Sequence, residues 1–245
     1  MCHSARKWLA ILVAMTLLTG LMACSGEQQD VPTETTQTTT ATTAPDTATG
    51  TASPPAESSE PQDNDAQSAG LTVGTTAGPY FVSGSPELED GNLNYSGLEG
   101  EPIRIVGHVY GGEGNSKPLA GAKVDMWHAD AAGSYHPNSS GDAIDYGANV
   151  IALRGFVLTD ENGAYAIDTI YPGYYEGRTR HIHVTTTAED YGSITTQIIV
   201  PARSGDGATP ENDSIARMLP DENHVTFENQ DGVETATFDF HLGGD

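Results

Sequence analysis

The chain contains 245 residues, carries a formal net charge of −24 and is 37% hydrophobic. Because a polyanion would be repelled at long range, this charge excludes nucleic acid as a partner and argues against an anionic membrane surface. A neutral or cationic small molecule is a better candidate for the binding partner. The hydrophobic content is low for a fully globular protein, so we expect part of the chain to be unfolded.

An apolar run near the N-terminus, from Trp8 to Ala23, is predicted to be an export signal because it is too short for a stable transmembrane helix. It ends in Leu21-Met22-Ala23-Cys24, which resembles the lipobox of bacterial lipoproteins. This resemblance implies a lipoprotein-type signal peptide over residues 1–24 and a lipidated Cys24, with a plain secretory signal as the alternative. We therefore expect an exported protein that is lipid-anchored to the bacterial cell envelope.

The next segment, residues 25–70, has the composition of a disordered tether. It is rich in Thr, Ala, Pro, Ser and acidic residues, contains no Lys or Arg and has too few large apolar side chains to form a core. Between residues 71 and 245, apolar and polar residues alternate between turn residues, which indicates one domain. This domain holds 26 acidic and eight basic residues, so it carries a charge of about −18 by itself.

The domain is predicted to be all-β, an antiparallel β-sandwich with long active-site loops at residues 136–151 and 202–222. Short segments of β-forming residues are separated by turn signals such as Asp160-Glu161-Asn162-Gly163, and helical periodicity is nearly absent. The predicted strands are Ile103–Tyr110, Ala122–Trp127, Ala152–Leu158, Ala164–Ile170, Arg180–Thr187, Ser193–Val200 and Glu234–Leu242.

One predicted strand contains the pair of histidines His181 and His183. Because side chains alternate along a strand, both imidazoles lie on one face and Ile182 lies on the other. Two ligands on one face can share a metal ion. The same pattern also occurs in histidines that bind no metal, so the pair alone does not decide the function.

A cupin-like metal dioxygenase is one alternative for this pair, because three nitrogens and one carboxylate form an acceptable metal site. Such a site needs a glutamate three or four residues after the second histidine, whereas Glu189 has five intervening residues. It also needs a further histidine in a glycine-rich motif, and neither His224 nor His241 has that setting. The spacing therefore disfavours a cupin.

Several motifs around the histidine pair occur in an order that resembles the intradiol ring-cleavage dioxygenases. The likeness covers about half of the chain and is closest to the exported branch of that family. Several separated motifs in one order are a specific signal. They are Gly78-Pro79-Tyr80, the segment from Gly121 through Trp127 to Tyr135, Leu153-Arg154-Gly155, Asp160 to Gly163, and the segment from Thr169 to His183.

This resemblance implies a non-haem iron(III) site, Fe(3+), whose ligands are Tyr135, Tyr175, His181 and His183. The chemistry agrees, because iron(III) is a hard cation that suits phenolate oxygens and can deprotonate tyrosines whose free pKa is about 10. The register of the family places the metal on the second aromatic residue after Pro172-Gly173. Tyr175 is therefore the implied ligand rather than Tyr174.

The resemblance also implies cleavage of a catechol by O2 between its hydroxyl-bearing carbons, giving a cis,cis-muconate-type product. Tyr175 would accept a proton from the substrate, Arg178 would stabilise negative charge on its ring, and Gln197 would support the site. Trp127 and Tyr80 would line the substrate pocket together with Arg178. Each of these three residues has a structural alternative. Trp127 could be a core residue, Tyr80 could pack against a turn, and Arg178 could form a surface salt bridge.

A transthyretin-like surface binding module is the competing class. Lys117–Val124 followed by Asp160–Tyr165 resembles such modules, which implies a transthyretin-like (prealbumin-like) sandwich fold. That class explains the strands but not two tyrosines and two histidines at matching intervals. Val157 and His136 depart from the pattern of the family and affect the expected substrate pocket. The sequence does not specify which catechol is the substrate or how many copies of the chain assemble.

Overall fold

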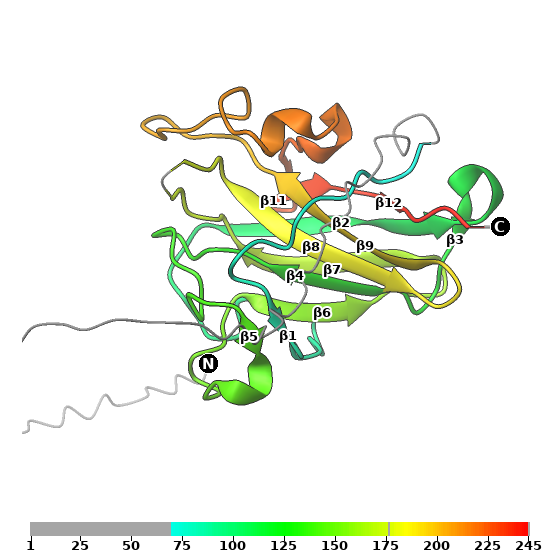
Figure 1. The fold of residues 1–245 in the computed structure, drawn as a ribbon, viewed down its shortest axis with the longest axis horizontal. Helices are drawn as coiled ribbons and strands as arrows, with labels where there is room; N and C mark the ends of the chain where they lie inside the picture. The colour runs from blue at the N-terminus through cyan, green and yellow to red at the C-terminus, as the bar shows by residue number, and fades with distance from the viewer. Residues whose placement is uncertain (1–69, 176, 245) are drawn as a thin grey trace, which may run out of the picture. The chain divides into compact units, whose positions relative to one another are not determined.

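The computed structural model describes residues 70–175 and 177–244. The predicted signal peptide, residues 1–24 with Cys24, and the predicted tether up to residue 69 lie outside the described residues. The described part is all-β, with strands linked by loops and short 3₁₀ turns (Figure 1). None of its helices is long and apolar enough to cross a membrane. The predicted all-β class is thus confirmed.

The strands form two large sheets and one small pair. The antiparallel four-stranded sheet has the order β6-β4-β8-β9, formed by β6 (Arg154–Leu158), β4 (Lys123–Trp127), β8 (His181–Ala188) and β9 (Gly192–Ile199). The six-stranded sheet is formed by β10 (Glu228–Gln230), β11 (Val233–Thr237), β2 (Pro102–Gly111), β12 (Phe240–His241), β3 (Lys117–Pro118) and β7 (Ala164–Ile170). The parallel pair is β1 (Val82–Ser83) with β5 (Gly141–Asp142).

The last predicted strand, Glu234–Leu242, differs from the structure in two ways. It is interrupted at Phe238-Asp239, because a carboxylate oxygen of Asp239 accepts the backbone N–H of His108 at 2.7 Å in place of a backbone carbonyl. The two resulting strands, β11 and β12, also pair with β2 in parallel. The prediction of a wholly antiparallel sheet is therefore wrong at this position.

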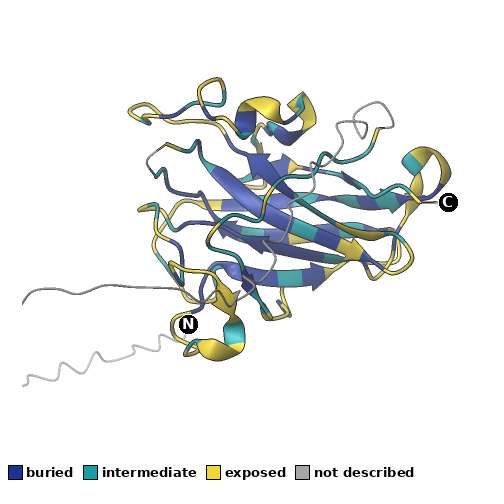
Figure 2. Ribbon diagram, viewed as in Figure 1, coloured by how far each residue is buried: buried dark blue, intermediate teal, exposed yellow. Residues whose placement is uncertain are grey.

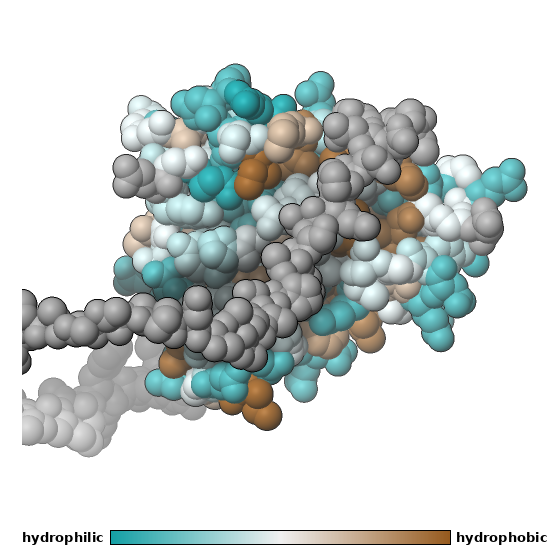
Figure 3. All heavy atoms as spheres, viewed as in Figure 1, coloured by the Kyte–Doolittle hydropathy of each residue, from teal (hydrophilic) through white to brown (hydrophobic). Residues whose placement is uncertain are grey.

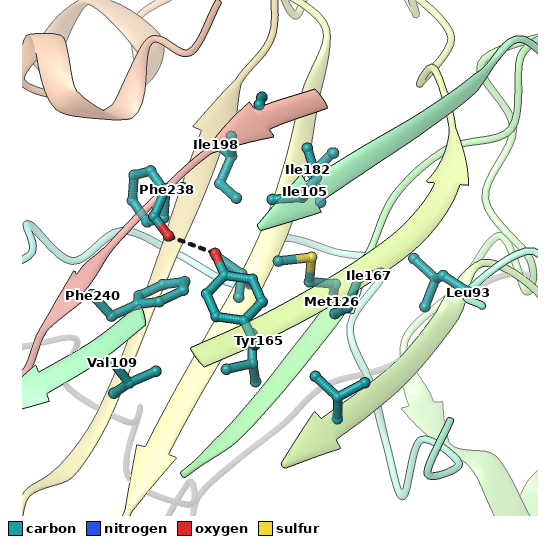
Figure 4. Close-up of a cluster of buried hydrophobic side chains, with 14 of the residues drawn as sticks. Leu93, Ile105, Val109, Met126, Tyr165, Ile167, Ile182, Ile198, Phe238 and Phe240 are labelled. Carbon is teal, nitrogen blue, oxygen red and sulfur yellow. Dashed lines mark hydrogen bonds between the residues drawn. The ribbon is translucent and has the colours of Figure 1, made fainter. Parts of the chain in front are cut away.

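One hydrophobic core lies between the two large sheets, as Figures 2 and 4 show. Strand β2 alternates between buried and partly exposed residues along its length, and its inward side chains meet those of β4, β7, β8 and β9. The Tyr165 hydroxyl lies within this core and donates a hydrogen bond to the Phe238 carbonyl at 2.6 Å. Each buried large aliphatic side chain stabilises the fold by about 1.5–3 kcal/mol. On the face drawn in Figure 3, hydrophobic residues form only small separate patches.

The buried histidine that follows β4, His128, is held by two hydrogen bonds. Its Nδ1 donates to the Ala129 carbonyl at 2.8 Å, so Nε2 is the acceptor for the Thr169 hydroxyl, also at 2.8 Å. Burial lowers the pKa of His128 to about 4. The folded protein therefore keeps this imidazole neutral at pH values where an unfolded histidine is protonated.

We expect the free energy of unfolding to fall as the pH drops from about 6.5 towards 4, because only the unfolded chain then takes up a proton at His128. Between pH 7 and pH 5 this histidine accounts for a loss of about 2 kcal/mol. Urea unfolding of the wild type and of His128→Gln at both pH values measures it. For each protein, the free energy of unfolding at pH 5 is subtracted from that at pH 7, so any destabilisation by the substitution that is the same at both pH values cancels. Equal differences in both proteins would show that His128 is not responsible.

Candidate metal centre

The histidine pair of β8 faces away from the main core. His181 and His183 are each 2% exposed, and Ile182 between them packs into the core cluster on the opposite face. Strand β8 lies between β4 and β9, where His183 is opposite Trp127 on one side and Gln197 on the other. The predicted shared face of the two imidazoles is confirmed.

Four side chains meet at the Nε2 atom of His181. This nitrogen lies 3.1 Å from Nε2 of His183, 3.2 Å from the Tyr175 hydroxyl oxygen and 3.4 Å from the Tyr135 hydroxyl oxygen. The tyrosines come from two separate loops and their rings contact each other edge to face, with centroids 5.7 Å apart. The structure therefore brings together all four side chains that the sequence indicated as ligands.

Two glycines allow the tyrosine-bearing loops to touch through their backbones. A Cβ atom at Gly133 would clash with the Tyr174 carbonyl, and one at Gly173 would clash with the Asp130 carbonyl. The Gly173 N–H instead donates to that Asp130 carbonyl at 2.8 Å. Close packing of the loops at these two positions is what sets Tyr135 beside Tyr175.

The Nε2 atom of His181 can form a hydrogen bond with only one of its three neighbours. His181 Nδ1 lies 2.7 Å from the Thr179 carbonyl, which only accepts, so Nε2 of His181 carries a single lone pair. Three neighbouring groups then compete for that one acceptor. Ligands of one metal ion at bond lengths of about 2 Å lie about 3 Å apart, so the observed separations fit a shared cation.

The composition of this cluster restricts how a metal could be bound. In the described ranges, no group of three or more His, Cys, Asp or Glu side chains is placed to hold a metal ion. A metal in this cluster would therefore need the tyrosine oxygens as well as the two imidazoles. Mixed oxygen and nitrogen donors of this kind suit a hard, highly charged transition-metal ion.

The protonation states of the cluster also fit a cation. Burial, with Arg178 acting in the same direction, lowers the pKa of His181 to about 4. Burial and the adjacent His181 lower the pKa of His183 well below its usual value, so both imidazoles are neutral. Burial raises the pKa of Tyr135 and of Tyr175. A bound cation would counter that burial and favour the phenolates.

The predicted pocket residues pack directly on the rings of the cluster. The Trp127 and His183 rings are stacked at 5.0 Å with an interplanar angle of 4°, and the Tyr80 and Tyr135 rings are stacked at 4.4 Å. A Cβ atom at Gly78, where φ is +74°, would lie 3.3 Å from the His183 ring. Trp127 and the Gly78-Pro79-Tyr80 segment therefore hold the cluster from two sides.

The guanidinium group of Arg178 is fixed by two side chains. Its Nε donates to Asp213 at 2.9 Å and its Nη2 donates to the Gln197 side-chain carbonyl at 2.7 Å. The Arg178 N–H donates to the Tyr175 carbonyl at 3.2 Å across a turn in which Gly177 has a φ of +82°. This turn places Arg178 and Tyr175 at the same end of β8.

Asp213, in the predicted loop 202–222, is a site residue that the sequence did not reveal. Its side chain is fully buried and accepts hydrogen bonds from Arg178 and from the N–H groups of Thr179, Ile215 and Ala216. Although burial favours its neutral form, these bonds hold the pKa of Asp213 below its usual value. The length of the loop was the only signal in the sequence that pointed to this region.

Three further residues near the motifs have partners outside the cluster. Tyr174 points towards Gly207 in the loop 202–222, which is consistent with Tyr175 being the residue beside His181. Val157 packs in the main core, so it is not a polar position of the pocket. His136 is paired with Asp130 at 2.8 Å.

The two other arginines near this region have structural partners. Arg180 forms two bonds to Asp206, at 2.6 and 2.7 Å. Arg154 has no carboxylate partner among its hydrogen bonds and instead donates to the carbonyls of Tyr80, His136 and Pro137. It is 1% exposed, and burial lowers its pKa to about 10.

Residues 76–244 match the profile of a family described as Dioxygenase. The chain is 32% identical over 166 residues to a catechol 1,2-dioxygenase of Acinetobacter baylyi, covering 56% of this chain and 50% of the relative. It is 31% identical over 161 residues to a 6-chlorohydroxyquinol 1,2-dioxygenase of Cupriavidus pinatubonensis, covering 58% of this chain and 54% of the relative. The chain thus spans about half the length of these curated relatives.

Among solved structures, the chain is similar to the dioxygenase domain of a dioxygenase carbohydrate-binding protein fusion from the cellulolytic bacterium Streptomyces sp. SirexAA-E. The two are 31% identical with a TM-score of 0.57, and the match covers 71% of this chain and 99% of that domain. The similarity therefore extends over nearly the whole of that domain.

We expect Arg154→Met to destabilise the fold by at least about 3 kcal/mol, because three carbonyls would lose a donor in a buried position. Urea unfolding of the metal-free protein measures this loss. Arg104→Met is the matched control, since the Arg104–Asp168 pair is about 40% exposed and such pairs contribute less than about 1 kcal/mol. Similar losses in both variants would contradict a special role for Arg154.

Proposed function

The chain belongs to the family of intradiol ring-cleavage dioxygenases, and we propose that it cleaves a catechol with O2 between the two hydroxyl-bearing carbons, giving a cis,cis-muconate-type product. One observation carries the proposal, namely the convergence of Tyr135, Tyr175 and His183 on Nε2 of His181. The names of the relatives, which are catechol and chlorohydroxyquinol 1,2-dioxygenases, support the substrate class.

The proposed cofactor is iron(III), Fe(3+), held by Tyr135, Tyr175, His181 and His183. The donor set supports this choice, because phenolates stabilise a hard trivalent cation and neutral imidazoles complete its ligand shell. When bound, iron(III) would act as a Lewis acid that binds the catechol oxygens and makes the ring reactive towards O2 without an external reductant.

The two tyrosines are proposed to have different roles. The Tyr135 side chain is 3% exposed and stacked on Tyr80, whereas Tyr175 is only partly buried. Tyr175 therefore has more freedom to take a proton from the catechol and hold it as a neutral phenol. Arg178, held by Asp213 and Gln197, would stabilise negative charge on the substrate ring.

The aromatic side chains around the cluster support the binding of a substrate with a flat ring. Trp127 and Tyr80 are proposed to line it, since each stacks on a ring of the cluster. Gln197 lies opposite His183 in the sheet and accepts from Arg178, so it would keep the guanidinium in place.

The alternatives explain less of the structure. The histidines that a cupin-like site would require are engaged elsewhere, because His224 bonds the Ala216 carbonyl and His241 stacks on Tyr110. A non-catalytic binding module would leave the tyrosine and histidine cluster without a purpose. For the fold, we propose a mostly antiparallel transthyretin-like sandwich. The hydrophobic core that the two large sheets share supports this proposal.

Iron-loaded protein incubated with catechol and ¹⁸O₂ tests the function directly. We expect a cis,cis-muconate in which two oxygen atoms carry the label, because both atoms of O2 enter the product, and mass spectrometry measures them. The purified protein should also be reddish, because phenolates bound to iron(III) absorb visible light. Colourless protein from iron-replete medium, or a ring-cleaved aldehyde instead of a diacid, would contradict the proposal.

Three variants serve as controls for the same experiment. His181→Ala should lose the metal. Tyr175→Phe should keep some iron but turn over at least about 100-fold more slowly, because a positioned proton acceptor is worth about this much. Tyr174→Phe is the matched control, since that hydroxyl points towards Gly207, and it should keep its iron and colour. Normal cleavage by both His181→Ala and Tyr175→Phe would overturn the ligand assignment.

We also propose that the protein is exported and anchored to the cell envelope through a lipid on Cys24. The support is the sequence pattern of residues 1–24 and the tether composition of residues 25–70. Expression of the full chain in bacteria with labelled palmitate should label the wild type but not Cys24→Ser. Unlabelled wild-type protein in the medium would favour the secretory alternative.

A further inference from the structure

The cations near the tyrosine and histidine cluster are all engaged within the protein. Two arginines lie next to the cluster: the Arg154 guanidinium is 5.8 Å from the centroid of the Tyr135 ring, and the Arg178 N–H donates to the Tyr175 carbonyl. Arg154 is 1% exposed and its three nitrogens all donate to backbone carbonyls. His136, which follows Tyr135 in the chain, is paired with Asp130. Arg154 is buried with its donors occupied, so it cannot form a direct ion pair with a substrate, and the pair of His136 with Asp130 carries no net positive charge.

Arg178 is neutralised by a carboxylate that cannot move away. The Asp213 side chain is fully buried, one oxygen accepting from Arg178 and Thr179 and the other from Ile215 and Ala216. To pair with an anion on the substrate, Arg178 would have to share its charge between two carboxylates or leave Asp213 buried without its ion pair. Both arrangements are unfavourable.

The charge of the whole domain acts in the same direction. Residues 71–245 hold 26 acidic and eight basic side chains, a net charge of about −18. The electric field of these charges repels an anionic substrate and attracts a cationic one. Salt screens the field, with a Debye length of about 10 Å at an ionic strength of about 0.1 M. A local effect of Asp213 and a long-range effect of the domain therefore both oppose a negatively charged catechol.

We propose that the site selects catechols whose ring substituents are neutral or cationic, that it discriminates against catechols that carry a carboxylate, and that Asp213 determines this specificity by neutralising Arg178. The inference rests on the proposed ring cleavage. Ring cleavage by itself does not specify the charge of the substituent on the substrate ring. Asp213 acts through Arg178 and is a positioning residue rather than a catalytic one.

Two pairs of substrates of matched shape isolate the charge of the substituent. 3,4-Dihydroxyphenylacetamide and 3,4-dihydroxyphenylacetate differ in charge but hardly in size, as do 4-propylcatechol and 4-(2-aminoethyl)catechol. For the iron-loaded wild type, kcat/KM for the amide should exceed that for the acid at least about tenfold. The amine should be cleaved at least as well as 4-propylcatechol, with an advantage that falls as salt is added.

Asp213→Asn removes the neutralising charge with little change in side-chain volume. Arg178 then carries an unbalanced positive charge, so the amide-to-acid ratio of kcat/KM should fall to a third of the wild-type value or less. Each ratio comes from one protein sample, so a lower iron content or a partly inactive preparation of this variant cancels. A purely structural role for Asp213 would slow both substrates equally and leave the ratio unchanged.

Asp206→Asn is the matched control. It makes the same change to an aspartate that pairs with an arginine, and it alters the net charge of the domain by the same amount. Its partner Arg180 lies over the Tyr171 ring and bonds the Pro172 carbonyl, rather than Gln197 or the cluster. If the long-range field alone set the preference, both variants would shift the ratio equally. We expect a shift only in Asp213→Asn.

The possible outcomes separate this inference from the proposed function. Cleavage of catechol together with equal kcat/KM for the amide and the acid would overturn the charge selectivity and leave ring cleavage standing. Equal shifts in the two variants, or no shift in Asp213→Asn, would overturn the role of Asp213. No cleavage of catechol or of any of the four substrates would overturn both proposals.

Discussion

The hydrogen bond between His181 Nδ1 and the Thr179 carbonyl is the constraint on which the rest of the site depends. It fixes the imidazole tautomer and leaves one lone pair directed at His183 and at the two tyrosines beside it. That lone pair can accept a hydrogen bond from only one of these three groups. A bound cation would contact all four side chains at once, so the surrounding sheets and loops hold them in an arrangement that suits a metal ion.

The sequence predicted the long strands from β-forming residues between turn signals, and in β2, which buries one face, burial and side-chain alternation leave the same trace along the chain. Side-chain alternation also predicted the common face of His181 and His183. Strands β1, β3, β5 and β10 have two or three residues each, too few for a period to be visible. The break at Asp239 depends on a partner, His108, that is 131 residues away, so no local pattern could predict it.

The candidate ligands were identified from the order of several motifs, whereas their supporting residues were found only in part. Gln197 was expected because it falls in a matching motif. Asp213 was not, because its partners Arg178 and Thr179 are 35 and 34 residues away and a loop aspartate has no pattern of its own. The partners of Arg154 are backbone carbonyls, which leave no pattern in the sequence. Non-local hydrogen bonding is common to the residues that the sequence could not assign.

The parallel pairing of β11 and β12 with β2 has a consequence for how the domain folds. Strand β2 precedes β11 and β12 by more than 120 residues, so this side of the sheet forms only after the intervening strands have been synthesised. Contacts of such large sequence separation fold slowly. Until β11 and β12 arrive, one edge of β2 is an unpaired template that can pair with another chain. The nascent protein therefore depends on β11 and β12 for protection against aggregation.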